Sequence, residues 1–228
     1  MTRIEAGLVD MDGVLIDSEP VHFRMTVETL GAAGLPAPDE AEYDEHFFGR
    51  PDRDGFSDWL LRHHMDADVE RLVAEKLVRM TDGFDELVVA CDDGQWLARE
   101  LHRHGLPLAI VSGGRRGGNG LVGRQFGLGH PFPAPASSRD GRAGKPDPDP
   151  FLTGAAALGV APAACAVIED AVPGLRAAEA AGMWPIVVDR RGEPERFAPV
   201  EAFDALDGRV LRLLLDRAGR GSALDEDD

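Results

Sequence analysis

The chain has 228 residues, 43% of them hydrophobic and 29% charged, a composition typical of a globular domain that carries at most a smaller insertion. Acidic residues outnumber basic ones by 41 to 24, and the formal charge of −17 argues against nucleic acid and anionic membranes as partners. No apolar run approaches the roughly 20 residues that cross a bilayer, and the N-terminus turns acidic too early for a secretory signal. Cys91 and Cys165 are too few for a disulfide framework or a zinc cluster. We therefore expect a soluble, cytoplasmic protein, and the sequence does not decide its oligomeric state.

The chain opens with an almost continuously apolar run at Ile4–Val9, as expected for a strand that is buried on both faces of a parallel sheet. A long stretch of helical patterns without a convincing strand follows it. Three segments there have helical spacing, namely Pro20–Leu30, Phe56–His64 and Val69–Met80. Because this block follows the first strand directly, we interpret residues 17–85 as an inserted helical cap domain.

Strands and helices alternate in the remainder of the chain. Three further apolar runs predict buried strands at Leu106–Val111, Cys165–Ile168 and Trp184–Val188. Helical segments accompany them at Gln95–His104, Phe151–Leu158 and Leu175–Ala181. Residues 131–148 are predicted to be a long loop, and the polar end at 216–228 is predicted to be disordered. The alternation predicts an α/β fold whose Rossmann-like core, with a parallel sheet, comprises residues 1–16 and 86–215.

Polar side chains follow three of the predicted strands at the point where each strand ends. Asp10 and Asp12 follow the first run, Ser112 the second, and the pair Glu169 and Asp170 the third. In an open α/β sheet, ligands bind beyond the carboxyl ends of the strands, so we expect these side chains to meet at one edge. Lys145, in a loop that precedes a helix, can add a positive charge there.

Such a group of residues suits phosphoryl transfer. Several carboxylates in one place repel one another unless a cation lies among them, and oxygen ligands with a substrate phosphate suit Mg²⁺. A carboxylate can serve as the nucleophile and form an aspartyl-phosphate, while a second carboxyl group transfers the proton. Lys145, Ser112 and the backbone N–H groups of Gly113 and Gly114 can hold the phosphoryl oxygens.

Four segments resemble, in order, the four motifs of the haloacid dehalogenase (HAD) superfamily. They are VDMDGVLIDSEP at 9–20, VSG at 111–113, GKPDPDPF at 144–151 and IEDAVPGLRAAEAAGM at 168–183. One D-x-D-G match alone is weak, but four matches in family order are much stronger. The most similar branch holds small sugar-phosphate phosphatases and β-phosphoglucomutase, and its helical cap is inserted at the place of the insertion here.

The resemblance implies a role for each matching position. Asp10 is implied as nucleophile and Mg²⁺ ligand, and Asp12 as general acid/base that also gives its backbone carbonyl to the metal. The other implied site residues are phosphate-binding Ser112 and Lys145, and metal-binding Asp170 and Glu169, the last directly or through water.

The function that we expect is Mg²⁺-dependent hydrolysis of a phosphoric monoester of a small metabolite, with sugar phosphates as the favoured class. The carboxyl group of Asp12 supports an ester, because an alkoxide leaving group needs a proton. Members of the superfamily that cleave carbon–halogen or carbon–phosphorus bonds lack this group. A phosphomutase of the β-phosphoglucomutase type is the main alternative, and a non-catalytic protein that binds a phosphorylated metabolite is a remote one.

Two stretches depart from the family pattern. After Ser112 the sequence GGRRGGNGLVG has six glycines in eleven residues, so the helix that is usual there is expected to begin late or to be short. In the cap, Gly49 is followed three residues later by Asp52, where the β-phosphoglucomutase pattern has an arginine that grips a distal phosphate. This mismatch counts against a mutase. The cap residues that are candidates for substrate contact are His22, Arg50 and Arg53.

Overall fold

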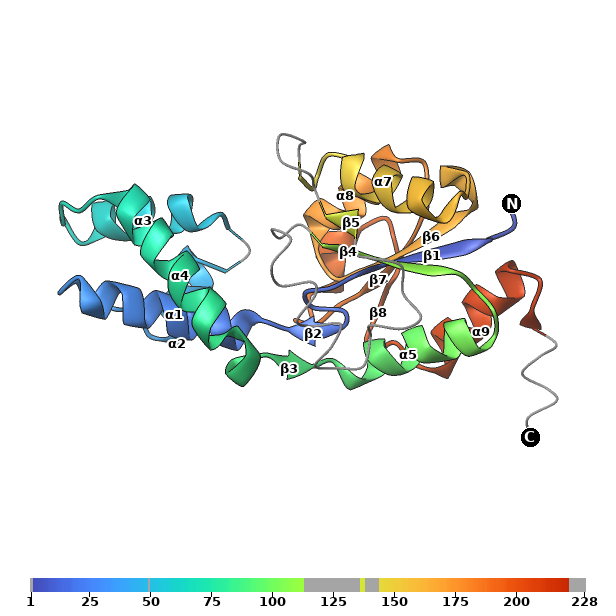
Figure 1. Ribbon diagram of the computed structural model, residues 1–228, viewed down its shortest axis with the longest axis horizontal. Helices are drawn as coiled ribbons and strands as arrows, with labels where there is room; N and C mark the ends of the chain where they lie inside the picture. The colour runs from blue at the N-terminus through green and yellow to red at the C-terminus, as the bar shows by residue number, and fades with distance from the viewer. Residues whose placement is uncertain (1, 49, 113–135, 138–143, 222–228) are drawn as a thin grey trace. The chain divides into compact units, whose positions relative to one another are not determined.

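The computed structural model describes residues 2–48, 50–112, 136–137 and 144–221 (Figure 1). The chain divides into two compact units. One comprises Met1–Asp17 with Ala90–Asp228 and is called the core below; the other is Ser18–Val89 and is called the cap.

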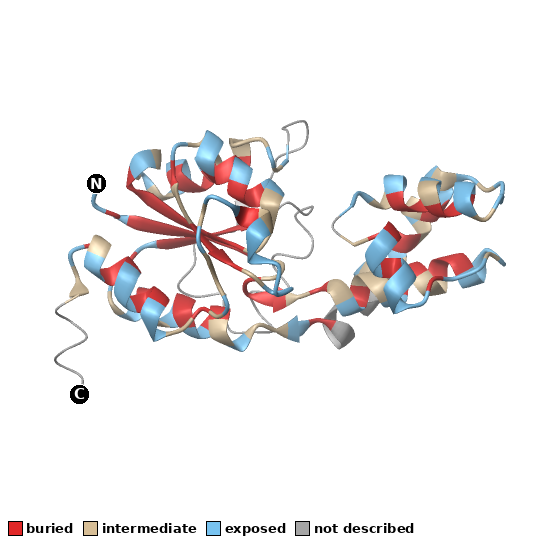
Figure 2. Ribbon diagram, turned by 180° about the vertical axis from the view of Figure 1, so that it is seen from behind, coloured by how far each residue is buried: buried red, intermediate tan, exposed pale blue. Residues whose placement is uncertain are grey.

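The core is built on a six-stranded parallel sheet with the strand order β5-β4-β1-β6-β7-β8. Its four inner strands are β1 (Ala6–Asp10), β4 (Leu108–Ser112), β6 (Cys165–Glu169) and β7 (Trp184–Val188), and its edge strands are β5 (Ala136–Ser137) and β8 (Ala202–Phe203). Every residue of β1, β4 and β6 is buried, as Figure 2 shows in red. The prediction of an α/β fold with buried parallel strands is confirmed.

Three of these strands extend one residue beyond the apolar run that predicted them, and that residue is polar. Asp10 pairs in register with Val111, and Ser112 and Glu169 close β4 and β6 in the same way. The apolar runs miss these residues because their side chains are polar although they are buried, whereas the hydrogen-bond ladder decides where a strand ends. The polar groups are therefore part of the sheet and not of the loops after it.

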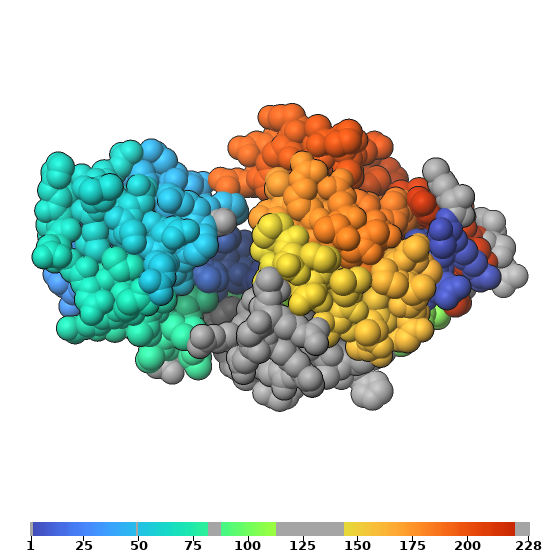
Figure 3. Space-filling model, turned by 90° about the horizontal axis from the view of Figure 1, so that it is seen from above, coloured from blue at the N-terminus to red at the C-terminus, as the bar shows by residue number. Residues whose placement is uncertain are grey.

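Helices cover both faces of the sheet (Figure 1). One face carries α7 (Asp149–Leu158) and α8 (Val172–Ala180), and the other carries α5 (Asp92–Arg103) and α9 (Gly208–Arg217). Figure 3 looks onto the first face, where the yellow and orange segments lie side by side over the sheet. Beneath them, apolar side chains from sheet and helices form one buried cluster that includes Leu8, Val111, Phe151, Val167 and Ala178.

Several short elements were not predicted. β2 (Ile16–Asp17) and β3 (Val89–Ala90) form a separate two-stranded sheet, and 3-10 helices lie at Pro162–Ala164 and Pro194–Phe197. β5 lies within the segment that was predicted to be a loop. α9 continues to Arg217, so the stretch predicted to be disordered begins inside a helix, because Leu214 and Leu215 anchor that helix in the core. Residues 222–228 lie outside the described part of the chain.

The cap consists of α1 (Glu19–Ala32), α2 (Glu40–His46), α3 (Asp52–Arg62) and α4 (Val69–Leu87). α2 was missed, although the pattern that starts it is local: Asp39 accepts the N–H of Glu42, and Glu42 accepts the N–H of Asp39, in a capping box. The cap has an apolar core of its own, formed by Leu30, Tyr43, Phe47, Phe56, Trp59, Leu60 and Leu72.

Among the described residues, no helix combines the length and the apolar character that are needed to cross a membrane. The cytoplasmic location stays a prediction.

The start of α5 lies against the chain segment that follows β1. The side-chain amide of Gln95 and the backbone N–H of Cys91 both donate to the carbonyl of Leu15, each over 3.1 Å. Gly94 makes this approach possible, because a Cβ atom built there would lie 1.8 Å from the carbonyl oxygen of Val14. Two segments that are far apart in the sequence are thus joined in the core through backbone groups.

We predict that Gly94→Ala destabilises the protein by about 1–3 kcal/mol, because the added methyl group would lie 1.8 Å from a backbone carbonyl oxygen and the chain must shift to admit it. Gly31→Ala is the matched control, since Gly31 lies in α1 and a Cβ atom added to it would have no neighbour within 4 Å. That change is expected to stabilise the chain by about 0.5–1 kcal/mol. Urea denaturation measures both variants, and a neutral Gly94→Ala contradicts the close approach.

Candidate active site

The register of the sheet brings the polar strand ends together. Asp10 at the end of β1 pairs with Val111, so Ser112 lies at the adjacent tip of β4. On the other side of β1, Val9 pairs with Ile168, which places Glu169 at the adjacent tip of β6. The three residues therefore lie together at the C-terminal ends of the parallel strands, where α/β proteins bind their ligands.

Three carboxyl groups and one amine form the centre of the site. Asp10, Glu169 and Asp170 each offer an oxygen, and these oxygens lie within 4.8 Å of one another. The Nζ of Lys145 lies 2.6 Å from Oδ1 of Asp10 and also contacts Oε1 of Glu169. Asp10 and Glu169 are buried, and the side chain of Lys145 is only 12% exposed. The structure thus brings these four residues together at one edge of the sheet.

The short segment after β6 holds Glu169 in one orientation. Its Oε2 accepts the backbone N–H groups of Asp170 and Ala171, each over 2.9 Å. Gly174 in α8 leaves the space for this carboxylate, since a Cβ atom there would lie 1.7 Å from Oε1. With Lys145 on the other oxygen, both oxygens of Glu169 already have donors from the protein.

Asp170 lies against the loop that follows Asp12. Gly13 has a φ of +76°, and a Cβ atom on it would lie 2.0 Å from Oδ2 of Asp170. Glycine is therefore required at this position both by its backbone conformation and by the approach of the carboxylate.

Burial and mutual repulsion control the charges. Burial raises the pKa of Asp10 well above its ordinary value, and Glu169 and Asp170 add to that rise while Lys145 opposes it. Burial and the charge of Glu169 raise the pKa of Asp170 to about 7. Burial alone lowers the pKa of Lys145, but the carboxylates of Asp10 and Glu169 outweigh it and raise that pKa. The site thus places three carboxyl groups around one lysine, so that ionising Asp10 and Asp170 together with Glu169 is unfavourable.

The donor set fits Mg²⁺. All three groups are hard oxygen donors, and one oxygen from each lies within 4.8 Å of the others, so the donor chemistry suits a shared Mg²⁺. Because both oxygens of Glu169 have protein donors, Asp10 and Asp170 are the better candidates for direct ligands. Glu169 is better suited to orienting Lys145 or holding a metal-bound water.

For the other residues predicted at this site, the structure gives their burial or their electrostatic effect but no distance to the carboxylates. Ser112 is fully buried at the tip of β4. Asp12 is half-buried, and its charge contributes to raising the pKa of both Asp10 and Asp170, which places it near them. Gly113 and the glycine-rich stretch after it lie outside the described residues.

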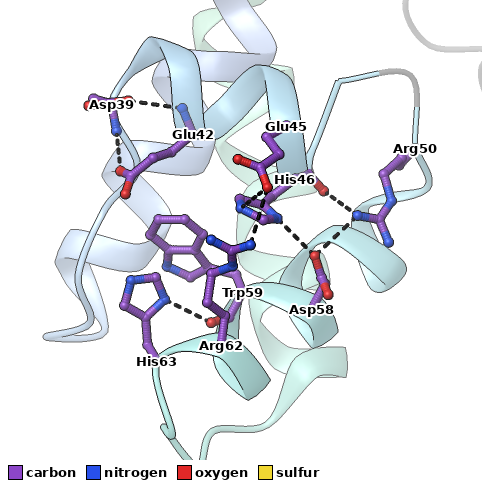
Figure 4. A network of polar contacts seen from close by, with 9 residues as sticks. All are labelled: Asp39, Glu42, Glu45, His46, Arg50, Asp58, Trp59, Arg62 and His63. Atoms are coloured by element: carbon purple, nitrogen blue, oxygen red, sulfur yellow. Dashed lines mark hydrogen bonds and ion pairs between the residues drawn. The ribbon is translucent and has the colours of Figure 1, made fainter.

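The cap contains the three predicted substrate residues, which are His22, Arg50 and Arg53. Both arginines form ion pairs with carboxylates of the cap. Arg53 donates to Glu70 over 2.7 Å. Figure 4 shows Arg50 turned toward Asp58, to which its Nη1 donates over 3.2 Å. His46 contacts the same Asp58 oxygen through Nδ1, over 2.9 Å. His22 lies in the first turn of α1. Contact of these three residues with a substrate stays a prediction.

Arg190 and Asp93 were missed by the sequence analysis. Arg190 follows β7 and donates to the carbonyl of Gly13 and to both carboxylate oxygens of Asp93. The one available signal is that Arg190 comes two residues after a predicted strand, at the edge of the sheet where the other polar residues gather.

Comparison with known proteins agrees with this geometry. The family model for haloacid dehalogenase-like hydrolases matches residues 4–182. The chain belongs to this family. It is 32% identical to hexitol phosphatase A of Escherichia coli over 206 residues, which is 87% of this chain and 89% of that protein. It is 33% identical to fructose-1-phosphate phosphatase YqaB of Escherichia coli over 189 residues, 78% of this chain and 93% of that one.

A solved structure supports the same assignment. CbbY from Rhodobacter sphaeroides, in complex with phosphate, superposes with a TM-score of 0.72 at 27% identity, over 89% of this chain and 95% of CbbY. A variant of that protein has also been solved with xylulose 1,5-bisphosphate. The membership of the HAD family predicted from the four motifs is confirmed.

We predict that Asp170→Asn makes the metal-free HAD protein more stable at pH 8. The folded-state pKa of Asp170, about 7, exceeds the value near 3.9 of an unfolded chain. Stability from the protonated group is therefore present below pH 4 and is lost as the pH rises through 7. Asparagine removes that loss, and each 1 kcal/mol regained raises Tm by about 2–4 °C in a chain of this size.

Thermal unfolding in EDTA at pH 5 and pH 8 measures this effect. The gain is expected to be largest at pH 8 and smaller at pH 5, where only part of the loss has occurred, and Mg²⁺ is expected to stabilise the wild type more than the variant. Asp66→Asn, at an exposed position, is the control. Equal Tm values of Asp170→Asn and wild type at pH 8 contradict the repulsion.

Proposed function

We propose that the protein is a Mg²⁺-dependent phosphatase that hydrolyses phosphoric monoesters of small sugars or sugar alcohols through an aspartyl-phosphate. The observation that carries the proposal is the buried carboxylate of Asp10 at the tip of β1, 2.6 Å from the ammonium of Lys145 and grouped with Glu169 and Asp170. The phosphatases among its relatives support the reaction class, and their substrates support sugar and hexitol phosphates.

In this proposal Asp10 is the nucleophile. Its free oxygen attacks phosphorus, the new Asp10–phosphorus bond forms, and the bond from phosphorus to the ester oxygen breaks. Lys145 offsets the charge of the phosphoryl oxygens, and Ser112 with the N–H of Gly113 donates to them. Asp10, Asp170 and the carbonyl of Asp12 would hold Mg²⁺, which would supply further positive charge to the phosphoryl group.

Asp12 moves the proton in both halves of the reaction. It gives a proton to the departing alkoxide, which leaves as an alcohol, and then takes a proton from the water that attacks the aspartyl-phosphate. The second half releases inorganic phosphate and returns Asp10 to its starting state. Atoms and charges balance with water as the only co-substrate.

The cap favours a phosphatase over a phosphomutase, which must hold a second phosphate. Asp52 stands where the mutase pattern has its phosphate-gripping arginine. Its Oδ1 accepts a hydrogen bond from the buried Lys76 over 2.5 Å, so the carboxylate at that position and its ammonium partner are already paired with each other. We further propose that His22, Arg50 and Arg53 contribute to recognition of the sugar.

Product analysis separates the alternatives. Incubation with a hexose 1-phosphate and Mg²⁺ is expected to release inorganic phosphate and to form no 6-phosphate. Formation of the 6-phosphate supports the mutase instead. If no phosphoester in a broad panel is turned over while one of them raises Tm, the protein is a binding protein.

Asp10→Asn is expected to abolish turnover, with a loss of at least about 10⁴-fold that leaves the fold intact, because the amide cannot form the covalent bond. Phosphate release and circular dichroism measure the two properties. Retained activity removes Asp10 from the role of nucleophile.

Asp12→Asn is expected to slow alkyl phosphates by about 10²–10⁴-fold, the usual contribution of general acid–base catalysis. The rate of the first step with p-nitrophenyl phosphate is expected to fall much less, because its leaving group departs without a proton. Single-turnover rates on both esters measure this step. Equal losses on the two argue against acid catalysis by Asp12.

A further inference from the structure

Arg190 joins three segments of the core that are far apart in the sequence. Its Nε donates to the carbonyl of Gly13 over 2.8 Å, and its Nη1 and Nη2 donate to Asp93 over 2.7 and 3.0 Å. A planar guanidinium that binds a carboxylate with two parallel bonds is held in one orientation. Its third donor is therefore aimed at Gly13.

Asp93 is itself fixed from several sides. Besides Arg190, it accepts the backbone N–H of Gly94 over 2.8 Å and that of Leu206 over 3.0 Å. Burial alone raises the pKa of Asp93, but the hydrogen bonds from Arg190, Leu206 and Gly94 outweigh burial and lower that pKa. The anion that orients Arg190 thus stays charged and anchored at the start of α5.

Gly13 is the residue directly after Asp12. Its N–H, which lies in the same peptide plane as the carbonyl of Asp12, donates to the carbonyl of Ile16 over 2.7 Å. Its own carbonyl accepts Arg190. The two peptide planes that follow Asp12 are thereby fixed, one by Ile16 and one by Arg190.

We infer that Arg190 is a positioning residue for proton transfer: through the carbonyl of Gly13 it holds the loop that carries Asp12 in its working orientation, with Asp93 as its anchor. This inference rests on the proposed function, because it assigns Arg190 to the proton-transfer step of that reaction. Arg190 acts through Asp12 and touches neither the substrate nor the reacting atoms.

Lysine cannot replace arginine in this role. An ammonium is a single point of charge, and it cannot hold both oxygens of Asp93 while it also reaches a carbonyl in a fixed direction. Arg190→Lys and Arg190→Gln are therefore both expected to release Gly13, although lysine keeps the charge. A role that depended on charge alone would survive in Arg190→Lys.

The experiment compares two esters. Single-turnover rates, kcat and KM are measured on an alkyl phosphate and on p-nitrophenyl phosphate for the wild type, Arg190→Lys, Arg190→Gln and the control Arg176→Gln. Arg176 also pairs with a carboxylate, Glu179, over 2.8 Å, but it lies on the surface of α8. Tm is measured for each variant.

The two Arg190 variants are expected to lose about 10–100-fold in the single-turnover rate of the first step on the alkyl phosphate. A loss of this size is what a misplacement of a catalytic group by about 1 Å can cause. On p-nitrophenyl phosphate the loss is expected to stay below about threefold, with KM little changed on both esters. Arg176→Gln is expected to match the wild type. If an Arg190 variant does not fold, Asp93→Asn, which removes the anchor, is expected to give the same selective loss.

A second comparison separates positioning from general support of the fold. In the background of Asp12→Asn, the change Arg190→Gln is expected to cause no further selective loss on the alkyl phosphate, because residues that act through one step are not additive. Equal losses of the single-turnover rate on the two esters, or full additivity of the rate losses of Arg190→Gln and Asp12→Asn, overturn the role of Arg190. The proposed phosphatase function is unaffected by either result. A wild type that hydrolyses neither ester overturns the proposed function, and the inference with it.

Discussion

The ion pairs of Lys145 are the interaction on which the site depends. Asp10 and Glu169 are buried at neighbouring strand tips, and an uncompensated buried carboxylate is costly. One ammonium contacts both of them and lies at the start of the loop that leads into α7. The same contacts fix the orientation of Asp10 and draw this loop to the edge of the sheet. The site is thus held in place by the charges that it needs for its chemistry.

Much of this arrangement follows from the sequence. Continuous apolar runs mark β1, β4, β6 and β7, since strands buried on both faces cannot alternate with polar residues. Parallel strands end at one edge, so polar residues that close those runs are brought together without any further assumption. The pattern of Asp10 and Asp12 and the later pair Glu169 and Asp170 could therefore be found before the fold was known.

Other features depend on information that no local pattern contains. Arg190 and Asp93 are 97 residues apart, and only the order of the strands makes them neighbours. α9 and the short strands are stabilised by tertiary packing more than by their own sequence. The capping box of Asp39 and Glu42 differs from these features, because its signal is local, although the helix that it starts is short and polar.

The separate apolar core of the cap has a consequence for how such enzymes diversify. The cap is one uninterrupted stretch of chain whose large side chains, Trp59 and Phe56 among them, pack against one another. Mutations that reshape its surface leave the strand tips of the core unchanged. Sequence change in one module can therefore proceed while the residues that hold the other module together are inherited without change.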